Sequence, residues 1–468
     1  MALAALVLVS VASTQAGAKP GPRPAQKPDA PLPIPVEKDA ALVAKINEAV
    51  ARGEAWLVKE QGPKGSWNNE ERGARTGYTE LALYALASSA EAIPSEPDLV
   101  APANAGKVKV EASEREVHAL AMGRAIVNGL KFVHGEPHPQ TYALSLLLLT
   151  LDARAAPRWE RSAFAKMSAA ERQRYAFPRA MSREDRSLAE TTVTTLLQNR
   201  FRGLWSYEQN PGTGDISNTQ FGLLGLRAAA RCGVFADPKV WWASIDEFLR
   251  GQEETGPSVK FSLPRSAPNG QIEAVEITAQ QRCWGYWFDR LGTITDAPRA
   301  DRAGGNHKLR PVKGFSFGAS GTHAAIGIAS LQIARDEMRR ALAKKPDDKL
   351  RATFAEREPA IDRAIRDGIG WLAGHWTLEE DPGGGFPFYY LYSIERAGQL
   401  VGDRILAGHD WYREGAEILL ARQLKDGAWP SDVGIVNAVG APDAVSTAFA
   451  LLFLRRATAP TVITPNIR

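Results

Sequence analysis

The sequence has few cysteines and little net charge. Its 468 residues include only two cysteines, Cys232 and Cys283, and carry a formal net charge of +4. The two thiols could pair in an exported protein, but nothing in the sequence brings them together, so we interpret them as buried and free. Lysine and arginine are spread thinly along the chain. The lack of a basic cluster argues against a nucleic-acid partner.

Long apolar stretches are also rare. Leu3–Ala12 is almost wholly apolar and is followed by the small residues Ala16-Gly17-Ala18. This pattern predicts a signal peptide over residues 1–18, although the usual Lys or Arg near its start is missing. The stretch is too short to span a membrane, and a lipid-embedded anchor is the alternative. We therefore expect an exported protein, periplasmic or extracellular, without a spanning segment after cleavage. Residues 19–40 are rich in proline, which predicts an extended linker.

The most informative stretch is the last complete unit, Trp411–Arg456. Its first part has apolar residues at helical spacing after Asp410, a suitable N-cap residue. A tight turn with Gly427 and Trp429 follows, and Thr447 then opens a helix that is apolar on nearly all sides. Such a helix must be buried on all sides. A hairpin of one solvated and one buried helix cannot cover its own surfaces, so the unit predicts repetition.

The repeat is present along the chain. The turn recurs at Gly65–Trp67, Gly203–Trp205, Gly285–Trp287 and Gly427–Trp429, with a phenylalanine version at Gly384–Phe386. A glutamine precedes three of these turns, at Gln61, Gln198 and Gln423. The buried helices are expected to start at Thr79, Thr141, Thr219, Thr322 and Thr447, and at Tyr389 or Tyr390 in the most divergent copy.

These markers predict six helix hairpins. They cover residues 41–90, 115–153, 184–232, 239–337, 360–401 and 410–457. Polar insertions lie between them, and the two at 253–282 and 288–313 flank Cys283. Loops of this length are often functional. We expect this pair at the end of the molecule that carries the Gly-x-Trp turns, where it could cover a cavity.

The repeat resembles that of a known superfamily. Gln-x(3)-Gly-x-Trp and Asp-x(3)-Thr-x-Phe-Ala-Leu-Leu-x-Leu, here Gln423–Trp429 and Asp443–Leu454, are similar to the repeat of squalene cyclases and protein prenyltransferase β subunits. The resemblance implies an all-α fold, an α/α toroid over residues 41–460 in which parallel inner helices form a ring wrapped by outer helices. Uncharacterised exported bacterial proteins have segments comparable to Tyr389–Arg396 and Asp410–Ala416.

Local physics gives several of these residues a structural role. Asp215 and Asp443 stand four residues before Thr219 and Thr447, where they would lie at the positive end of a helix dipole. The tryptophans of the turns can cover the hairpin ends while each indole N–H finds a carbonyl.

The catalytic groups that the resemblance would imply are incomplete. A cyclase of this superfamily takes its acid from an Asp-x-Asp-Asp-Thr motif, but Ser217 and Val445 occupy the acid position here. The segments around Cys283 and His323 are similar to the zinc ligands of prenyltransferases, yet two ligands are too few for a stable zinc site. We therefore expect no metal and no cofactor.

The remaining polar and aromatic residues define a candidate site. Candidate catalytic residues are Asp215, Glu395 and Asp443; candidate ligand-binding residues are Trp205, Tyr207, His323, Tyr389 and Tyr390. Glu395 and Arg396 lie inside a buried helix, where a charge is costly unless it is paired or faces a cavity. We also expect free N–H groups at the inner-helix starts to form a positive rim.

These observations favour a central cavity that binds an apolar or sugar-like ligand. The alternative is an enzyme of the terpenoid cyclase, prenyltransferase or polysaccharide lyase class, which would need paired acids beside aromatic side chains. The oligomeric state stays open.

Overall fold

The structure is a computed structural model, and it describes most of the chain after residue 35. The described residues are 36–67, 77–89, 114–135, 139–156, 179–207, 212–266, 272–288, 294–295, 318–344, 347–402, 404–432 and 439–457. The predicted signal peptide, residues 1–18, lies outside them. The predicted linker, 19–40, is described only from residue 36, where a short 3-10 helix, η1 (Val36–Lys38), precedes the first α-helix.

Two sets of helices alternate along the described chain. The outer set is α2 (Ala40–Glu60), α5 (Glu114–Gly135), α9 (Arg183–Gln198), α11 (Pro238–Gly251), α13 (Asp348–Gly374) and α15 (Trp411–Arg422). The inner set is α3 (Tyr78–Ser89), α6 (Thr141–Ala155), α10 (Ile216–Arg231), α12 (Gly321–Lys344), α14 (Pro387–Val401) and α16 (Ala444–Leu454). The all-α prediction and the six hairpins are thus confirmed.

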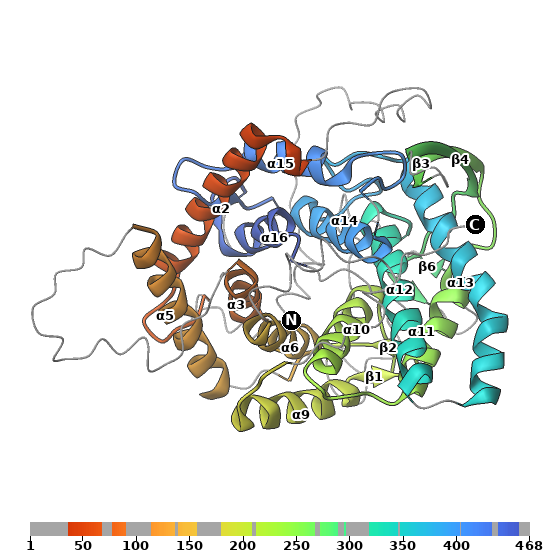
Figure 1. The fold of residues 1–468 in the computed structure, drawn as a ribbon, viewed down its shortest axis with the longest axis horizontal. Coiled ribbons are helices and arrows are strands. Elements are labelled where there is room, and N and C mark those ends of the chain that lie inside the picture. The colour runs from red at the N-terminus through yellow and green to blue at the C-terminus, as the bar shows by residue number, and fades with distance from the viewer. Residues whose placement is uncertain are drawn as a thin grey trace, which may run out of the picture.

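The inner helices form a closed ring. Each contacts the next in chain order, and the last, α16, contacts the first, α3 (Figure 1). The outer helices pack around this ring; α5 lies against α3, α9 against α6 and α13 against α12. Every residue of α3 and α10 is buried, as expected for helices covered on all sides. The fold is therefore the expected α/α toroid.

The inner helices run parallel. The first turns of α6 and α10 meet where Tyr142 contacts Ser217, and the start of α12 meets that of α14 where Tyr390 lies against Gly321. Phe388 at the start of α14 bonds to Asp432 in the turn before α16. Gly77, just before α3, lies against Ala143 in the first turn of α6, so all six helices begin at one end of the ring. The predicted starts at Thr79, Thr141 and Thr322 agree with the structure within one residue, and Tyr389 within two. Thr219 and Thr447 lie three residues inside α10 and α16, because Asp215 and Asp443 are the N-caps.

Three tryptophans hold the hairpin turns in one common way. The indole Nε1 of Trp67, Trp205 and Trp429 donates to a carbonyl of the outer helix in the same hairpin, at 2.7, 2.9 and 2.8 Å. Their backbone N–H groups donate to the hydroxyls of Thr79, Thr219 and Thr447. The turn also requires glycine, since Gly427 has φ of +99° and a Cβ there would lie 2.6 Å from the Arg52 carbonyl.

The fourth hairpin uses a different tryptophan from the predicted one. Trp284 donates its indole N–H to the outer helix, to Phe248 at 2.8 Å. Gly327 of α12 makes room for its ring. Trp287 instead lies in β5 (Trp287–Phe288), which pairs with β6 (Ile294–Thr295). The Gly-x-Trp pattern therefore placed this anchor three residues too late.

The insertion at 253–282 contains an antiparallel hairpin and not only a loop. Its strands are β3 (Ser258–Ser266) and β4 (Ile272–Gln280), which pack on the outer helix α13. Val259, Phe261 and Leu263 alternate toward the core, as in a half-buried strand. The other insertion, 288–313, lies mostly outside the described residues. Two further strand pairs are short: β1 (Arg200–Phe201) with β2 (Leu204–Trp205), and β7 (Trp429–Pro430) with β8 (Pro442–Asp443).

Candidate functional site

The N–H groups at the inner-helix starts are already bonded. Thr141, Ile216 and Gly321 donate to the carbonyls of Tyr207, Tyr286 and Pro382, at 3.2, 3.1 and 2.8 Å. In each case the acceptor belongs to the turn of the following hairpin. The predicted positive rim of free N–H groups is therefore wrong at these helices, because the neighbouring turn satisfies the donors.

Buried carboxyl groups cap the same helix ends. Asp215 accepts from the Asn218 N–H at 2.8 Å, and Asp443 accepts from the Ser446 N–H at 2.8 Å. The structural role predicted for these two residues is therefore confirmed. Their proposed catalytic role stays a prediction.

Two further capping carboxyls were not found from the sequence. Asp381 accepts from the N–H of Thr322 at 3.0 Å and from its hydroxyl at 2.5 Å. Asp432 accepts from the Phe388 N–H at 3.2 Å. Both side chains reach the preceding inner helix rather than their own. The only sequence signal was an acid near a turn, which does not identify a partner in another hairpin.

Burial changes the acidity of these caps. It raises the pKa of Asp215 and of Asp432 to about 6, and that of Asp381 to about 7, although the hydrogen bonds they accept act in the opposite direction. Desolvation outweighs those bonds because the carboxyls are shielded from water. Each group can therefore change its charge near neutral pH.

Asp215 also belongs to a hydrogen-bonded network with tyrosines. The Tyr142 hydroxyl lies 2.5 Å from Ser217 Oγ, which donates to Asp215 Oδ1 at 3.1 Å. The Tyr207 and Tyr286 hydroxyls are 3.0 Å apart. Burial raises the pKa of all three tyrosines well above the ordinary value, so their hydroxyls stay protonated. In this network the ionised Asp215 carboxylate accepts hydrogen bonds from Ser217 and Asn218.

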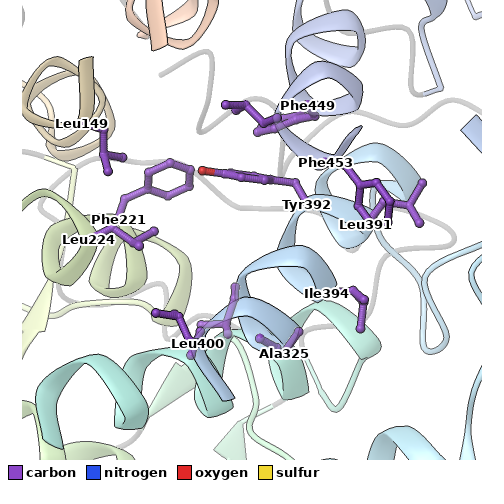
Figure 2. Packing of buried hydrophobic residues seen from close by; sticks show 14 of the residues in the cluster. Leu149, Phe221, Leu224, Ala325, Leu391, Tyr392, Ile394, Leu400, Phe449 and Phe453 are labelled. Atoms are coloured by element: carbon purple, nitrogen blue, oxygen red, sulfur yellow. The ribbon is translucent and has the colours of Figure 1, made fainter. Parts of the chain in front are cut away.

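Aromatic side chains continue from this network into the middle of the ring. Tyr142 of α6 meets Phe221 of α10 edge-on at 4.8 Å, and Phe221 stacks with Tyr389 of α14 at 6.3 Å. Phe449 of α16 lies 5.5 Å from Tyr389 and 5.4 Å from Tyr392. Figure 2 shows Phe221 and Tyr392 pointing toward one another from α10 and α14. The sequence had indicated Tyr389 but not Tyr142, Phe221 or Phe449, which look like ordinary core residues.

Arg396 lies against these rings. Its side chain is fully buried, and Cζ is 4.0 Å from the centre of the Tyr392 ring, 5.2 Å from Phe221 and 5.4 Å from Tyr389. One nitrogen, Nη2, donates to Ser393 Oγ at 2.9 Å. A cation enclosed by three aromatic faces therefore lies deeper in the ring than Asp215.

Glu395 is also fully buried, and its charge acts on Tyr392 of its own helix and on Tyr84 of α3. Burial raises the pKa of Tyr84 in α3 to about 12, and the charges of Glu395 and Asp152 contribute to that increase. Glu395 therefore lies near Tyr84. Its catalytic role stays a prediction.

His323 is neutral at physiological pH. Burial lowers its pKa to about 4, and its Nδ1 lies 2.8 Å from the Gly318 carbonyl. Its ring is 5.8 Å from that of Tyr286, which links it to the tyrosine network. His323 is thus placed to present a neutral imidazole.

The segments around Cys283 and His323, which resemble the zinc ligands of prenyltransferases, meet at Ser320. The Cys283 thiol donates to the Ser320 carbonyl at 3.5 Å, and the His323 N–H donates to the Ser320 hydroxyl at 3.2 Å. Burial raises the Cys283 pKa well above its usual range, so the sulfur stays a thiol. Cys283 and Cys232 are both free, as interpreted from the sequence. Within the described ranges, no three His, Cys, Asp or Glu side chains form a metal-binding group.

The structure brings together only part of the predicted site. Asp215, Tyr207, His323 and Tyr389 lie around one network at the inner-helix starts. Trp205 instead fills the space between α9 and α10, and the Tyr390 ring packs against Gly321 of α12. Asp443 caps α16. A ligand role for Trp205 and Tyr390 stays a prediction.

A groove outside the ring is the main alternative location. It has a volume of about 770 Å³ and is formed by α5, α6 and α9, with Leu144, Leu147 and Thr195 among its lining residues. Its described lining is mostly aliphatic, hydroxyl-bearing and charged. It lacks the stacked aromatic rings present in the centre.

Comparisons with known proteins add little. No family model matches the chain, and no curated protein is significantly similar to it. Among solved structures, a type II terpene cyclase from Scytonema, in complex with its product merosterolic acid A, is similar with a TM-score of 0.30 and 12% identity. The match covers 89% of this chain and 98% of that one. Within the described residues, no helix is long and apolar enough to cross a membrane.

Proposed function

We propose that the protein binds an apolar or sugar-like ligand among the aromatic side chains in the centre of the ring. The observation that carries this proposal is the continuous series of rings Tyr142, Phe221, Tyr389, Phe449 and Tyr392, supplied by four inner helices. Aromatic faces with a few polar groups are typical of small-molecule sites. Such faces suit both hydrocarbon chains and the apolar faces of sugar rings.

Binding is favoured over catalysis by how the carboxyls are used. Asp215, Asp381 and Asp432 each accept hydrogen bonds from a helix start. A carboxyl in that position stabilises the helix start, so its presence is explained without a catalytic role. The aromatic centre therefore has the features of a receptor more than of an acid–base site.

Relationship and location are further parts of the proposal. We place the chain in the squalene cyclase and prenyltransferase repeat superfamily, on the basis of the shared Gln, Gly-x-Trp and Thr positions. We also propose export, to the periplasm or beyond the cell, on the basis of residues 1–18. Detection of a protein that begins at Lys19, by N-terminal sequencing of the exported fraction, would test the export proposal.

The binding proposal is tested with the purified protein. Native mass spectrometry would identify co-purifying ligands, and tyrosine and tryptophan fluorescence would follow titration with isoprenoid alcohols and oligosaccharides. Phe221→Ala should weaken binding of the accepted ligand at least about tenfold, because it removes a central ring. Phe248→Ala is the matched control, since Phe248 belongs to the outer helix α11 and packs against Trp284. Equal loss of binding in both variants would contradict a central site.

An enzyme is the second candidate. The chain from the Tyr142 hydroxyl through Ser217 to Asp215 could relay a proton if the Asp215 carboxyl, with its pKa near 6, gained one. Conversion of a bound isoprenoid or glycan, detected as a new product mass and lost in Tyr142→Phe, would favour this class.

A further inference from the structure

Arg396 differs from other buried arginines in this protein. Arg179 and Arg231 contact Asp152 at 2.6 and 3.3 Å, and Arg335 contacts Asp362. These carboxylates balance the buried positive charges. Arg396 is equally buried, yet its described partners are one serine hydroxyl and three aromatic faces.

The guanidinium keeps unused donors. Nε and Nη1 complete no hydrogen bond of ordinary geometry with a described residue. The hydroxyls of Tyr389 and Tyr392 lie close enough to the guanidinium that it lowers both pKa values against the effect of burial, but a neutral hydroxyl does not balance the positive charge. An arginine carries five N–H groups and cannot lose its proton in a protein. Aromatic faces stabilise the charge but do not accept these in-plane donors as an oxygen would.

Glu395, the nearest acid in the sequence, does not satisfy the unused donors of Arg396. The charge of Glu395 acts on Tyr84 of α3 and also on Tyr392, the ring nearest Arg396, yet Nε and Nη1 of Arg396 have no hydrogen-bond acceptor among the described residues. The guanidinium lowers the pKa of Tyr389 against the effect of burial, but that pKa is still raised to about 12. The neighbouring tyrosines are therefore neutral and provide no negative charge. A buried charge with unsatisfied donors costs free energy, which an anionic partner would recover.

We infer that Arg396 receives the carboxylate of the ligand bound in the centre of the ring. This inference rests on the proposed binding function and adds the chemical class of ligand. One guanidinium balances one negative charge, and its planar fork matches the two oxygens of a carboxylate. The rings of Phe221, Tyr389 and Tyr392 then hold the apolar body of the same molecule. The body is either an isoprenoid chain or a sugar ring.

The experiment compares matched probes on the full exported chain. Each pair consists of an acid and a neutral partner that lacks the carboxylate: geranylgeranoic acid with geranylgeraniol, and oligogalacturonate with oligogalactose. Geranylgeranyl phosphate tests whether a different anion binds as well. The wild type should bind the acid of one pair roughly 10- to 100-fold more tightly than its neutral partner. Arg396→Met should remove that preference, so that the acid and its neutral partner bind with equal affinity.

Stability gives a readout that needs no probe. Without ligand, Arg396→Met should have an unchanged or higher Tm, because it removes an unbalanced buried charge. Arg335→Met is the matched control, since it breaks a paired arginine; its Tm should fall while its preference for the acid stays. A fall in Tm of more than about 5 °C in Arg396→Met would overturn the inference, because it would indicate a structural partner.

The outcomes separate the two proposals. If acid and neutral partner bind equally to the wild type, the binding function stands and the role of Arg396 is wrong. Tighter binding of the phosphate than of the acid also overturns the carboxylate assignment. If no probe binds, the proposed function fails for both ligand classes, and the carboxylate site fails with it. Should Arg396→Met not fold, the wild-type comparison of acid and neutral partner decides alone.

Discussion

The Gln423 side chain of the last hairpin joins the two ends of the fold. Its Nε2 donates to the Ala49 carbonyl in the first outer helix and to the Gly427 carbonyl of its own turn, both at 2.8 Å. The same double contact is made by Gln61 to Ala125 and Gly65, and Gln252 likewise reaches Ala364 and Arg282. In each of these hairpins a glutamine side chain thus bonds to the next hairpin, and the contact made by Gln423 closes the ring.

Gln423→Ala should lower the free energy of unfolding by about 1–3 kcal/mol, because two carbonyl partners lose their donor. Urea denaturation followed by circular dichroism would measure this. Gln61→Ala is the matched variant inside the ring and should cost a similar amount. A Gln423→Ala protein with wild-type stability, beside a destabilised Gln61→Ala protein, would mean that the ring is not closed in solution.

The repeated turn explains why so much of the fold could be predicted from the sequence. The Gly-x-Trp turn and the threonine after it are bonded to each other, so the same residue types recur in the same order, although the tryptophan and threonine are 12, 14 and 18 residues apart. The fourth hairpin breaks this rule. Thr322 bonds to Asp381 of the next hairpin, and Trp284 provides the anchor instead of Trp287. A hydrogen-bond partner that belongs to another hairpin, such as Asp381, leaves no short-range pattern in the sequence.

Trp429→Ala should destabilise the fold by about 3–5 kcal/mol, as expected for a large, fully buried aromatic side chain. Trp429→Phe keeps a ring but loses the N–H that bonds to Leu419, and should cost roughly 1–2 kcal/mol. Both values should be independent of added ligand. If Trp429→Ala instead kept its melting temperature and lost ligand binding, the tryptophan would be a site residue.

The site was less predictable than the fold. Asp215 was recognised from its place four residues before Thr219, and His323 from its similarity to a prenyltransferase zinc ligand at an inner-helix start. Phe221 and Phe449 were missed, because an aromatic residue facing the centre looks the same in sequence as one facing the core. The expected positive rim failed because the acceptors for the helix-start N–H groups, such as the Tyr286 carbonyl, come from the next hairpin.

Asp381→Asn should flatten the pH dependence of stability between about pH 4 and pH 7. Burial raises the folded-state pKa of Asp381 to about 7, while the unfolded value stays near 3.8. The folded state therefore binds the proton more tightly, so this stabilisation is complete below pH 4 and is lost as pH rises through 7. The wild type should lose on the order of 2–4 kcal/mol more than the variant across this range.

The control for this titration is Asp39→Asn. The Leu42 N–H and then Arg413 lower the Asp39 pKa, so its contribution is present above the ordinary pKa and is lost as the pH falls. This variant should keep the wild-type slope between pH 4 and pH 7. An unchanged slope in Asp381→Asn would contradict the raised pKa. Chemical denaturation at half-unit pH intervals would measure both variants.

Asp215→Ala and Glu395→Ala together distinguish a receptor from an enzyme. Asp215 caps α10, so its removal should cost about 1–2 kcal/mol in stability, and in a receptor it should leave ligand affinity nearly unchanged. Asp215→Asn keeps an oxygen for the Asn218 N–H but cannot take up a proton.

If a substrate is converted and both Asp215 variants lose turnover while Asp215→Asn stays folded, the acid is catalytic. If only Glu395→Ala loses turnover, the reaction takes place near Tyr84 instead. When neither change alters binding or turnover on isoprenoids and glycans, and both proteins stay folded, neither carboxyl belongs to the site.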